Sequence, residues 1–300
     1  MLFKYIYKTI KAFFELPKFF LRHTKPRLIM TLLVKNEEQM IGRNIEFHKH
    51  MGVDGFIVTD NSSTDKTLSI LKEYQKKGWI LEIIQEPSTG YEQKKWVDRM
   101  VMLAKNKYKA DWVINADADE FWYAKSSSLK NELSRTTANV VRCPWQNMLP
   151  DDSKPFWQWN QHVCPVSDFE KYDLSPFAIY EKQNKKVAHR TDGYIQISMG
   201  NHKVAMCPHH AVWSQDIVIY HFPIRGKKQF INKMVQGGKE LEEHKGKHGG
   251  RHWRYFYELY KAGLLEKEYE RVVGLNNYGA LLNDGYIKTC QSLEELLQKN

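Results

Sequence analysis

The chain has 300 residues, of which 42% are hydrophobic and 13% aromatic, and this composition excludes an intrinsically disordered protein. The formal net charge of +10 favours anionic partners, and it does not choose among nucleic acid, anionic lipid surfaces and phosphorylated substrates. The four cysteines form no C-x-x-C pair, which argues against a disulfide scaffold or a zinc knuckle and suits a reducing compartment.

Residues 1–25 form a basic amphipathic segment that precedes Pro26. Lysines recur among its phenylalanines, so no apolar run reaches the roughly 20 residues of a spanning helix, and no signal-peptide cleavage site follows. This pattern favours a helix in the membrane interface, and the alternative is a helix docked on the protein's own core. We therefore expect a cytoplasmic protein that binds the anionic inner face of the membrane through this segment.

The region from 28 to 122 alternates between the patterns of buried strands and amphipathic helices. Strands are predicted at residues 28–34, 56–59, 79–84 and from 112 onward, and helices at 40–50, 67–77 and 92–108. Such alternation predicts an α/β domain with a mainly parallel sheet flanked by helices.

The second half of the chain is less regular. Short strands are predicted at 140–145, 177–180, 194–197 and 216–223, an aromatic-rich loop at 150–176, and a mobile Gly- and His-rich loop at 237–250. The chain after Lys227 is predicted to be mostly helical. We expect a catalytic domain at 26–225 and a helical C-terminal extension at 226–300.

Three polar clusters follow predicted strands, each at the carboxyl end of its strand. They are Lys35-Asn36-Glu37, Asp60-Asn61-Ser62-Ser63 and Asp117-Ala118-Asp119. Because ligands of parallel α/β sheets bind outside the carboxyl ends of the strands, these clusters predict a binding site at one edge of the sheet.

Asp117 and Asp119 point to the same side of an extended segment, because side chains alternate with a period of two. Two carboxylates on one side repel each other unless a positive group lies between them. A divalent cation, Mg²⁺ or Mn²⁺, is the usual group, because both prefer hard oxygen ligands. The alternative is a solvated acidic loop after a strand.

Four motifs resemble those of glycosyltransferases with the GT-A fold, in particular the family 2-like group. They are LVKNE at 33–37, DNSSTD at 60–65, DWVINADADEF at 111–121, and HFPIR at 221–225 followed by Gln229-Phe230. The first three follow the family's order and spacing, whereas the match between Trp122 and Val218 is poor. The resemblance implies a Rossmann-like sheet with an irregular acceptor-side region.

The resemblance also implies a metal-dependent enzyme that moves a sugar from a nucleotide-sugar donor to a hydroxyl of a cell-surface glycan or a lipid-linked acceptor, with inversion. Carried over by position, Asp60 contacts the nucleoside, while Asp117 and Asp119 hold the ribose and the metal–diphosphate. A bound divalent ion suits this reaction, because the departing diphosphate gains negative charge. The implied nucleotide-binding residues are Val34, Asn36, Glu37, Asp60, Asn61 and Asp117.

Two further roles are implied by the resemblance. GT-A enzymes often take a metal ligand from a C-terminal histidine, and His221 fits this description, with His202 as the competitor. In a chain with 12 histidines, a given one is more often a surface or core residue than a ligand. Inversion needs a base within reach of the acceptor hydroxyl, and Asp168 and Asp192 are candidates by position, with a turn or surface role as the alternative.

Two other functions compete with this interpretation. The positive charge and aromatic content would suit a nucleic-acid-binding protein, but no nucleic-acid motif is present and acidic residues cluster where the ligand should bind. We therefore expect no nucleic-acid partner. The second alternative is a sugar-binding protein that has kept the fold without catalysis, and the intact Asp117 and Asp119 argue against it.

Overall fold

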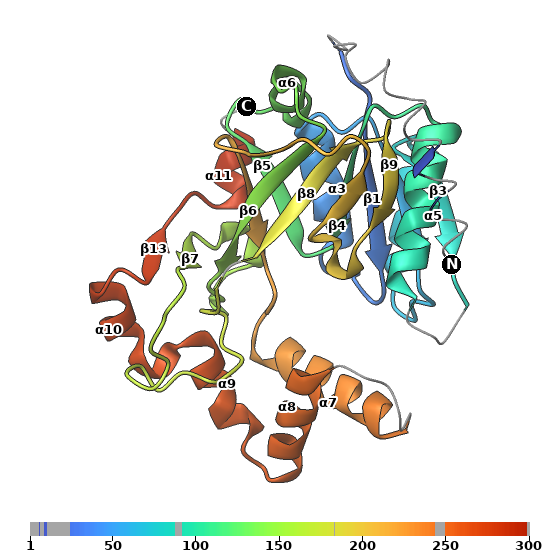
Figure 1. Cartoon of the computed structure of the whole chain (residues 1–300). Helices are drawn as coiled ribbons and strands as arrows, with labels where there is room; N and C mark the ends of the chain where they lie inside the picture. Colours follow the sequence, from blue (N-terminus) through green and yellow to red (C-terminus); the bar gives the residue numbers. More distant parts are fainter. Residues whose placement is uncertain are drawn as a thin grey trace. The chain divides into compact units, whose positions relative to one another are not determined.

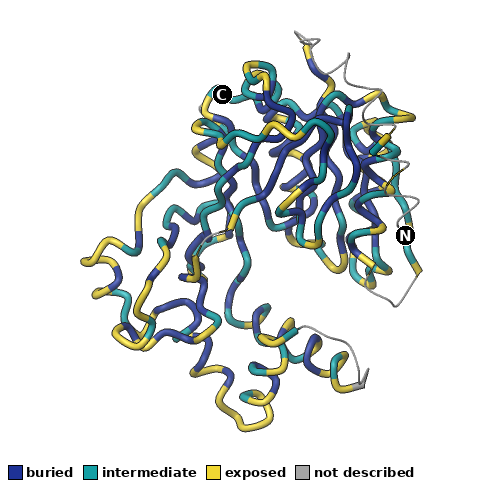
Figure 2. The backbone as a smooth tube through the Cα atoms, viewed as in Figure 1, coloured by how far each residue is buried: buried dark blue, intermediate teal, exposed yellow. Residues whose placement is uncertain are grey.

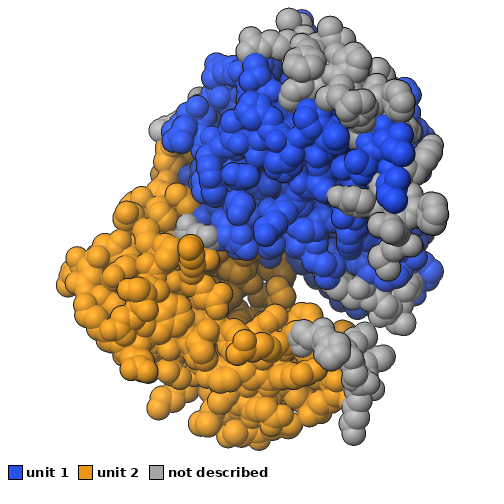
Figure 3. Space-filling view, viewed as in Figure 1, with its two compact units in different colours: residues 1–145, 184–220 blue, residues 146–183, 221–300 orange. Residues whose placement is uncertain are grey.

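The computed structural model describes residues 6, 9–10, 25–87, 92–182, 184–243 and 250–298. The chain divides into two compact units, shown in Figure 1 and coloured separately in Figure 3. The first comprises residues 1–145 and 184–220, and the second 146–183 and 221–300. No helix within the described ranges is long and apolar enough to span a bilayer. The predicted interfacial segment lies almost wholly outside these ranges.

The first unit holds the strands and helices that were predicted to form the α/β layer. In chain order its elements are β1 (Leu28–Val34), α3 (Ile41–His50), β2 (Gly55–Asp60), α4 (Thr67–Lys76), β3 (Ile80–Gln85), α5 (Gln93–Asn106), β4 (Trp112–Asp117), β5 (Glu120–Ala124), α6 (Leu129–Arg135), most of β6 (Val140–Met148), β8 (Lys185–Arg190), β9 (Tyr194–Ile197), η2 (Met199–Asn201), β10 (Val204–Met206), β11 (Ala211–Trp213) and most of β12 (Ile217–His221).

The sheet of the first unit has the order β3-β2-β1-β4-β8-β6. The strands β3, β2, β1 and β4 are parallel, and β8 and β6 continue the sheet as antiparallel neighbours. β1 reads LIMTLLV and is buried almost throughout, because such central parallel strands are covered on both faces (Figure 2). The predicted α/β class, with a parallel sheet flanked by helices, is confirmed.

α5 covers one face of this parallel sheet. Val97, Val101 and Ala104 recur at helical spacing and pack in one core cluster with Ile29 of β1 and Val113 of β4. This spacing places the apolar side chains on one face of a helix, so the segment between β3 and β4 forms a helix that packs on the sheet.

The second unit is built around a separate hydrophobic core. Its elements are the end of β6, η1 (Phe156–Gln158), β7 (Gln161–Val163), α7 (Lys227–Glu243), α8 (Arg251–Lys261), α9 (Leu265–Val273), η3 (Leu275–Asn277), α10 (Tyr278–Asn283), β13 (Ile287–Thr289) and α11 (Leu293–Gln298). The mostly helical character predicted after Lys227 is therefore confirmed.

The boundaries of the units differ from the predicted domains at 26–225 and 226–300. Residues 146–183 belong to the second unit because Leu149, Val163 and Tyr172 share a core with Phe230 of α7 and Phe256 of α8. This core joins segments far apart in the sequence, so no local change in composition marks the boundary.

Two local predictions in this unit are wrong. Residues 177–180 form turns and not a strand. Gly237 and Gly238, predicted to begin a loop, lie inside α7, where they give room to Trp253 and Tyr257 of α8. Residues 244–249 of the predicted loop lie outside the described ranges.

Candidate active site

The carboxyl ends of β1 and β2 lie side by side, and hydrogen bonds join the loops that follow them. Val34 is paired with Asp60, and the Asn61 N–H donates to Val34 O at 2.9 Å. The Thr64 N–H donates to Asn36 Oδ1 at 2.8 Å. Asn36 has a φ of 56°, a left-handed backbone that asparagine adopts more readily than most residues. The structure thus brings these predicted nucleotide-binding residues to one edge.

Asp60 is a buried carboxylate with one unsatisfied oxygen. It is 2% exposed, and the Ser63 N–H lies 3.4 Å from Oδ2, whereas Oδ1 has no hydrogen-bond partner among the described residues. Glu37 lies in the neighbouring loop, where its N–H donates to Thr67 Oγ1 at 2.8 Å. Since buried polar atoms are almost always hydrogen-bonded, Oδ1 of Asp60 is suited to accept from a ligand.

Asp117 ends β4 on the other side of β1. It is paired with Leu33, one position before the end of β1, and Asp119 lies in the two-residue turn to β5. Two strand spacings of ~4.8 Å separate β2 from β4, so the strands carrying Asp60 and Asp117 are about 10 Å apart. All three predicted polar clusters therefore meet at the same edge.

α3 holds the acidic turn in place through two fully buried side chains. Asn44 Nδ2 donates to the carbonyl oxygens of Ala118 at 3.0 Å and Glu120 at 2.9 Å. The Trp122 N–H donates to His48 Nε2 at 2.9 Å, so Nδ1 carries the ring proton and donates to Asn44 O at 2.8 Å. Burial lowers the pKa of His48 to about 3, which keeps the imidazole neutral.

The positive group beside the acidic turn is Lys186 of β8. Its Nζ donates to Asp117 Oδ2 at 2.8 Å and forms an ion pair with Glu120 Oε1 at 2.7 Å. Lys186 is 1% exposed and Glu120 is fully buried, whereas the Asp117 side chain is 38% exposed. Burial raises the pKa of Glu120, and the attraction of Lys186 opposes that shift. The ammonium of Lys186 thus lies between the carboxylates of Asp117 and Glu120.

The two candidate histidines belong to different units. His202 lies beside the pair formed by Asp117 and Lys186, and its ring packs edge-on against Trp145 at 5.5 Å. His202 Nδ1 lies 2.8 Å from the Lys185 carbonyl oxygen, a contact that leaves the Nε2 lone pair for a ligand. Burial lowers the pKa of His202, which favours the neutral form that binds metals. His221 belongs to the second unit, where Nδ1 contacts Asn147 Oδ1 at 2.7 Å.

The two candidate bases are held in turns. Asp192 follows β8, which runs antiparallel to β4, and the adjacent Thr191 N–H donates to Asp111 O at the amino end of β4. Asp192 therefore lies at the opposite end of β4 from Asp117, a correction to its predicted role. Asp168, in the second unit, is exposed and accepts from the Lys171 N–H at 3.0 Å through Oδ1.

The donor atoms at this edge fit a divalent cation that is shared with a diphosphate. The described ranges contain no group of three or more His, Cys, Asp or Glu side chains arranged to hold a metal alone. Magnesium commonly takes one or two carboxylates and completes its coordination with substrate phosphates and water. Asp117 and Asp119 carry two carboxylates at this edge, and His202 lies beside Asp117.

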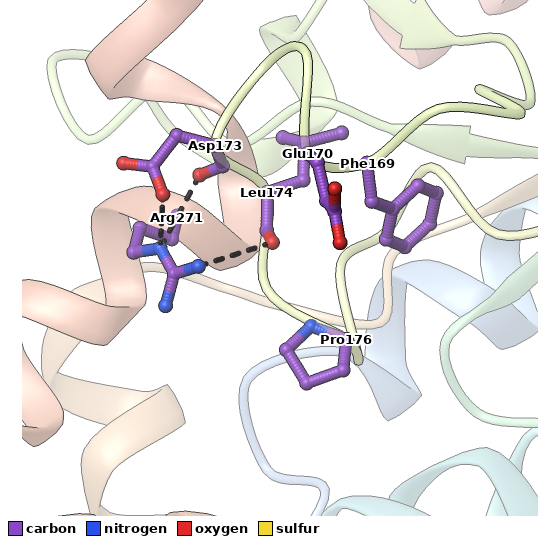
Figure 4. A pocket seen from close by; sticks show the side chains of 6 residues that line it. All are labelled: Phe169, Glu170, Asp173, Leu174, Pro176 and Arg271. Atoms are coloured by element: carbon purple, nitrogen blue, oxygen red, sulfur yellow. Dashed lines mark hydrogen bonds and ion pairs between the residues drawn. The ribbon is translucent and has the colours of Figure 1, made fainter.

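A cavity of about 610 Å³ lies within the second unit. Its lining residues, shown in Figure 4, are Phe169, Glu170, Asp173, Leu174, Pro176 and Arg271. Arg271 already pairs with Asp173 Oδ1 at 2.9 Å and with Glu268 Oε2 at 2.7 Å, so its charge is satisfied within the protein. The predicted site residues do not line this cavity.

Sequence reasoning missed Asn44, His48 and Lys186. Asn44 and His48 share a helix face at i, i+4 with apolar neighbours, which was a usable signal for buried polar contacts to another element. Lys186 sits in the segment KKVAHR, where nothing in the local pattern distinguishes a buried lysine from a solvated one.

The fold is an α/β sheet with an unsatisfied buried carboxylate and an acidic turn at its carboxyl edge, where ligands of such sheets bind. The model of glycosyltransferase family 92 matches residues 30–249, and the chain belongs to that family. The resemblance of the sequence motifs to glycosyltransferases is thereby confirmed, and the family model that matches is that of family 92.

The chain is similar to curated glycosyltransferases over part of its length and to a solved structure over most of it. A lipopolysaccharide core biosynthesis glycosyltransferase of Rhizobium meliloti is 29% identical over 172 residues, which is 57% of this chain and 54% of the relative. An uncharacterized glycosyltransferase of Rickettsia typhi is 39% identical over 90 residues, 30% of this chain and 26% of the relative. The chain thus spans about half or less of these relatives. A mannosyltransferase of Pyrobaculum calidifontis, solved with GDP-mannose and Mn²⁺, has a TM-score of 0.43 and 15% identity over 94% of this chain and 87% of that chain.

Proposed function

We propose that the protein is an inverting glycosyltransferase that moves a sugar from a nucleoside-diphosphate donor to a hydroxyl of a cell-surface glycan or a lipid-linked acceptor, with a divalent cation. The observation that carries this proposal is the meeting of Asp60, with its unsatisfied buried oxygen, and the turn at Asp117 and Asp119 at one edge of the sheet, in a member of family 92. The name of the Rhizobium relative supports a cell-surface glycan as the acceptor.

The proposed roles are those that the resemblance implies, and they are supported by the meeting of these residues at one edge of the sheet. Asp60 accepts a hydrogen bond from the nucleoside, while Val34, Asn36, Glu37 and Asn61 form the pocket around it. Asp117, at the end of β4, faces both the ribose and the cation, and Asp119 and His202 provide further ligands for Mn²⁺ or Mg²⁺. Such a cation, when bound, stabilises the negative charge on the departing diphosphate as a Lewis acid. His221 is kept as an alternative ligand.

Inversion requires a base at the acceptor hydroxyl. With Asp192 at the far end of β4, Asp168 is the candidate base that we retain, because its carboxylate is exposed. Asp168→Asn is expected to lower kcat for transfer while leaving donor binding unchanged. Unchanged kcat would exclude Asp168 as the base.

We also propose that residues 1–25 bind an anionic membrane surface at the cytoplasmic face. The support is the alternation of lysines and phenylalanines in this segment. Deleting residues 1–22 is expected to release the protein from anionic vesicles in a sedimentation assay without loss of donor binding. A truncated protein that still sediments with the vesicles would refute this proposal.

A thermal-shift panel of nucleotide sugars, each with and without Mn²⁺, tests the proposed function. A donor at 100 times its Kd should stabilise the fold by about 2.7 kcal/mol through mass action, and the shift should require Mn²⁺. The panel should cover UDP-, GDP-, dTDP- and CMP-linked sugars. The absence of a shift with every nucleotide sugar would refute a nucleotide-sugar donor.

A further inference from the structure

Lys186 forms a buried ion pair, and such pairs contribute little net free energy to folding. Its ammonium is 2.7 Å from the fully buried Glu120 and 2.8 Å from the half-exposed Asp117. Taking a lysine and a glutamate out of water costs several kcal/mol per ion, and a well-packed apolar pair often stabilises a core equally well. Stability alone therefore does not explain why a lysine lies here.

The geometry connects a buried anchor to a residue that faces the ligand edge. Glu120 fixes the ammonium from the interior, and Asn44 in turn fixes the main chain of Glu120 at 2.9 Å. The ammonium then holds Oδ2 of Asp117, which leaves Oδ1 as the oxygen outside this pair. The side chain of Asp117 is therefore oriented before any ligand arrives.

The same ammonium changes what Asp117 can bind. A cation that approaches Asp117 alone meets a positive charge already engaged with that carboxylate, and like charges repel strongly in a partly buried site. A diphosphate brings negative charge that offsets this repulsion. Lys186 thus favours a cation that arrives with a diphosphate over a cation by itself.

We propose that Lys186 is a positioning residue that orients Asp117 and suppresses binding of a free divalent cation, so that the cation binds together with the diphosphate. This inference rests on the proposed function, because it assumes that Asp117 lies at the donor's metal–diphosphate site. It adds a role for a residue of β8, far in sequence from the acidic turn.

The test compares Mn²⁺ binding in calorimetry, with Mn²⁺ alone and with Mn²⁺ plus UDP or GDP. The main variant combines Lys186→Met with Glu120→Gln, because Lys186→Met alone would leave Glu120 buried without its partner. We expect Mn²⁺ alone to bind at least about tenfold more tightly to the double variant than to the unmodified protein. The extra affinity gained by adding the nucleotide should shrink correspondingly.

Lys185→Met is the matched control. It removes a lysine ammonium one residue away, which lies 5.7 Å from the Trp213 ring. Because Asp117 keeps its partner, Mn²⁺ affinity should change by less than about threefold. Lys186→Arg provides a variant that keeps the charge, and it should retain the weak affinity for free Mn²⁺.

The direction of the change separates this role from a structural one. A damaged site would bind Mn²⁺ more weakly or not at all, so weaker or unchanged Mn²⁺ binding in the double variant would overturn the inference. Mn²⁺ binding by Lys186→Arg as tight as by the double variant would overturn it as well. If the unmodified protein bound Mn²⁺ neither alone nor with UDP or GDP, the proposed metal–diphosphate site would fail, and this outcome is distinct from the two that overturn the role of Lys186.

Discussion

His48 of α3 accepts a hydrogen bond at 2.9 Å from the main-chain N–H of Trp122, a residue 74 positions later in the chain. This contact lies next to the hydrogen bonds from Asn44 to the acidic turn. A helix from the start of the α/β layer therefore determines where Asp117 and Asp119 lie.

Asn44→Ala should lower the free energy of unfolding by about 2–4 kcal/mol. The substitution leaves the buried carbonyl oxygens of Ala118 and Glu120 without their donor, and each unsatisfied group costs about 1–3 kcal/mol. Urea unfolding measures the loss. Asn276→Ala is the control, because the Asn276 amide also donates two hydrogen bonds, to Asp173, but is exposed. Equal losses in the two variants would contradict this account.

The protein should lose stability as the pH falls from about 6.5 towards 3. Burial lowers the pKa of His48 to about 3, so below 6.5 the unfolded chain binds a proton that the folded chain does not. The free energy of unfolding then falls by about 1.4 kcal/mol per pH unit for this residue. Burial also lowers the pKa of His189 to about 4, so this residue adds a similar loss of stability between about pH 6.5 and pH 4.

Urea unfolding at pH 7.5 and 5.0 measures this effect. His48→Gln should reduce the loss between these two pH values by about 2 kcal/mol, because the proton uptake of one residue is removed. His50→Gln, at an exposed position of the same helix, should leave the difference unchanged. A pH dependence identical in His48→Gln and the unmodified protein would count against the burial of a neutral His48.

Asp60→Asn should weaken nucleotide binding about tenfold or more without loss of stability. The unsatisfied Oδ1 contributes nothing to the free fold, whereas a ligand hydrogen bond to a charged group is worth about 1.5–3 kcal/mol. Asp54→Asn should show the opposite pattern. Asp54 directly precedes the amino end of β2, and its Oδ2 accepts a hydrogen bond from the Leu28 N–H at 2.8 Å. The loss of this acceptor should lower stability and leave nucleotide affinity unchanged. Calorimetry and thermal unfolding measure the two quantities, and a matching pattern in both variants would contradict the assignment of Asp60.

Asp119→Asn should reduce sugar transfer and donor hydrolysis by about 100-fold or more, with the thermal unfolding midpoint unchanged. The substitution removes charge from the turn where the diphosphate is stabilised, and losses of this size accompany removal of such electrostatic groups. Asp111→Asn, just before the amino end of β4, is the control and should retain activity. Substantial turnover in Asp119→Asn would exclude a metal-binding role for this residue.

Gly238→Ala should destabilise the packing of α7 on α8 by about 1–3 kcal/mol. A Cβ at this position would lie 2.3 Å from Cβ of Tyr257, and both atoms belong to helices that cannot separate without loss of the core. Gly279→Ala in α10 meets no atom within 4 Å and should stabilise the protein by about 0.5–1 kcal/mol. Thermal unfolding distinguishes the two signs, and a neutral Gly238→Ala would mean that the helices pack less closely.

The parallel layer and the position of its polar clusters could be predicted from local sequence pattern. Each strand from β1 to β4 contains a short apolar run, and α5 has apolar residues at helical spacing, so local pattern was sufficient to predict them. The clusters at Asn36, Asp60 and Asp117 follow directly, because parallel strands end at the same edge of a sheet.

The residues that surround that edge could not be predicted from local pattern, because they come from distant segments of the chain. β8 carries Lys186, His189 and Arg190 in six residues, and it forms a buried strand because ion pairs and hydrogen bonds satisfy groups that local pattern assigns to solvent. Its antiparallel direction moves Asp192 to the far end of β4 and brings His202 beside Asp117. Strand direction and the partners of buried charges depend on contacts between distant segments, and no local stretch of sequence contains them.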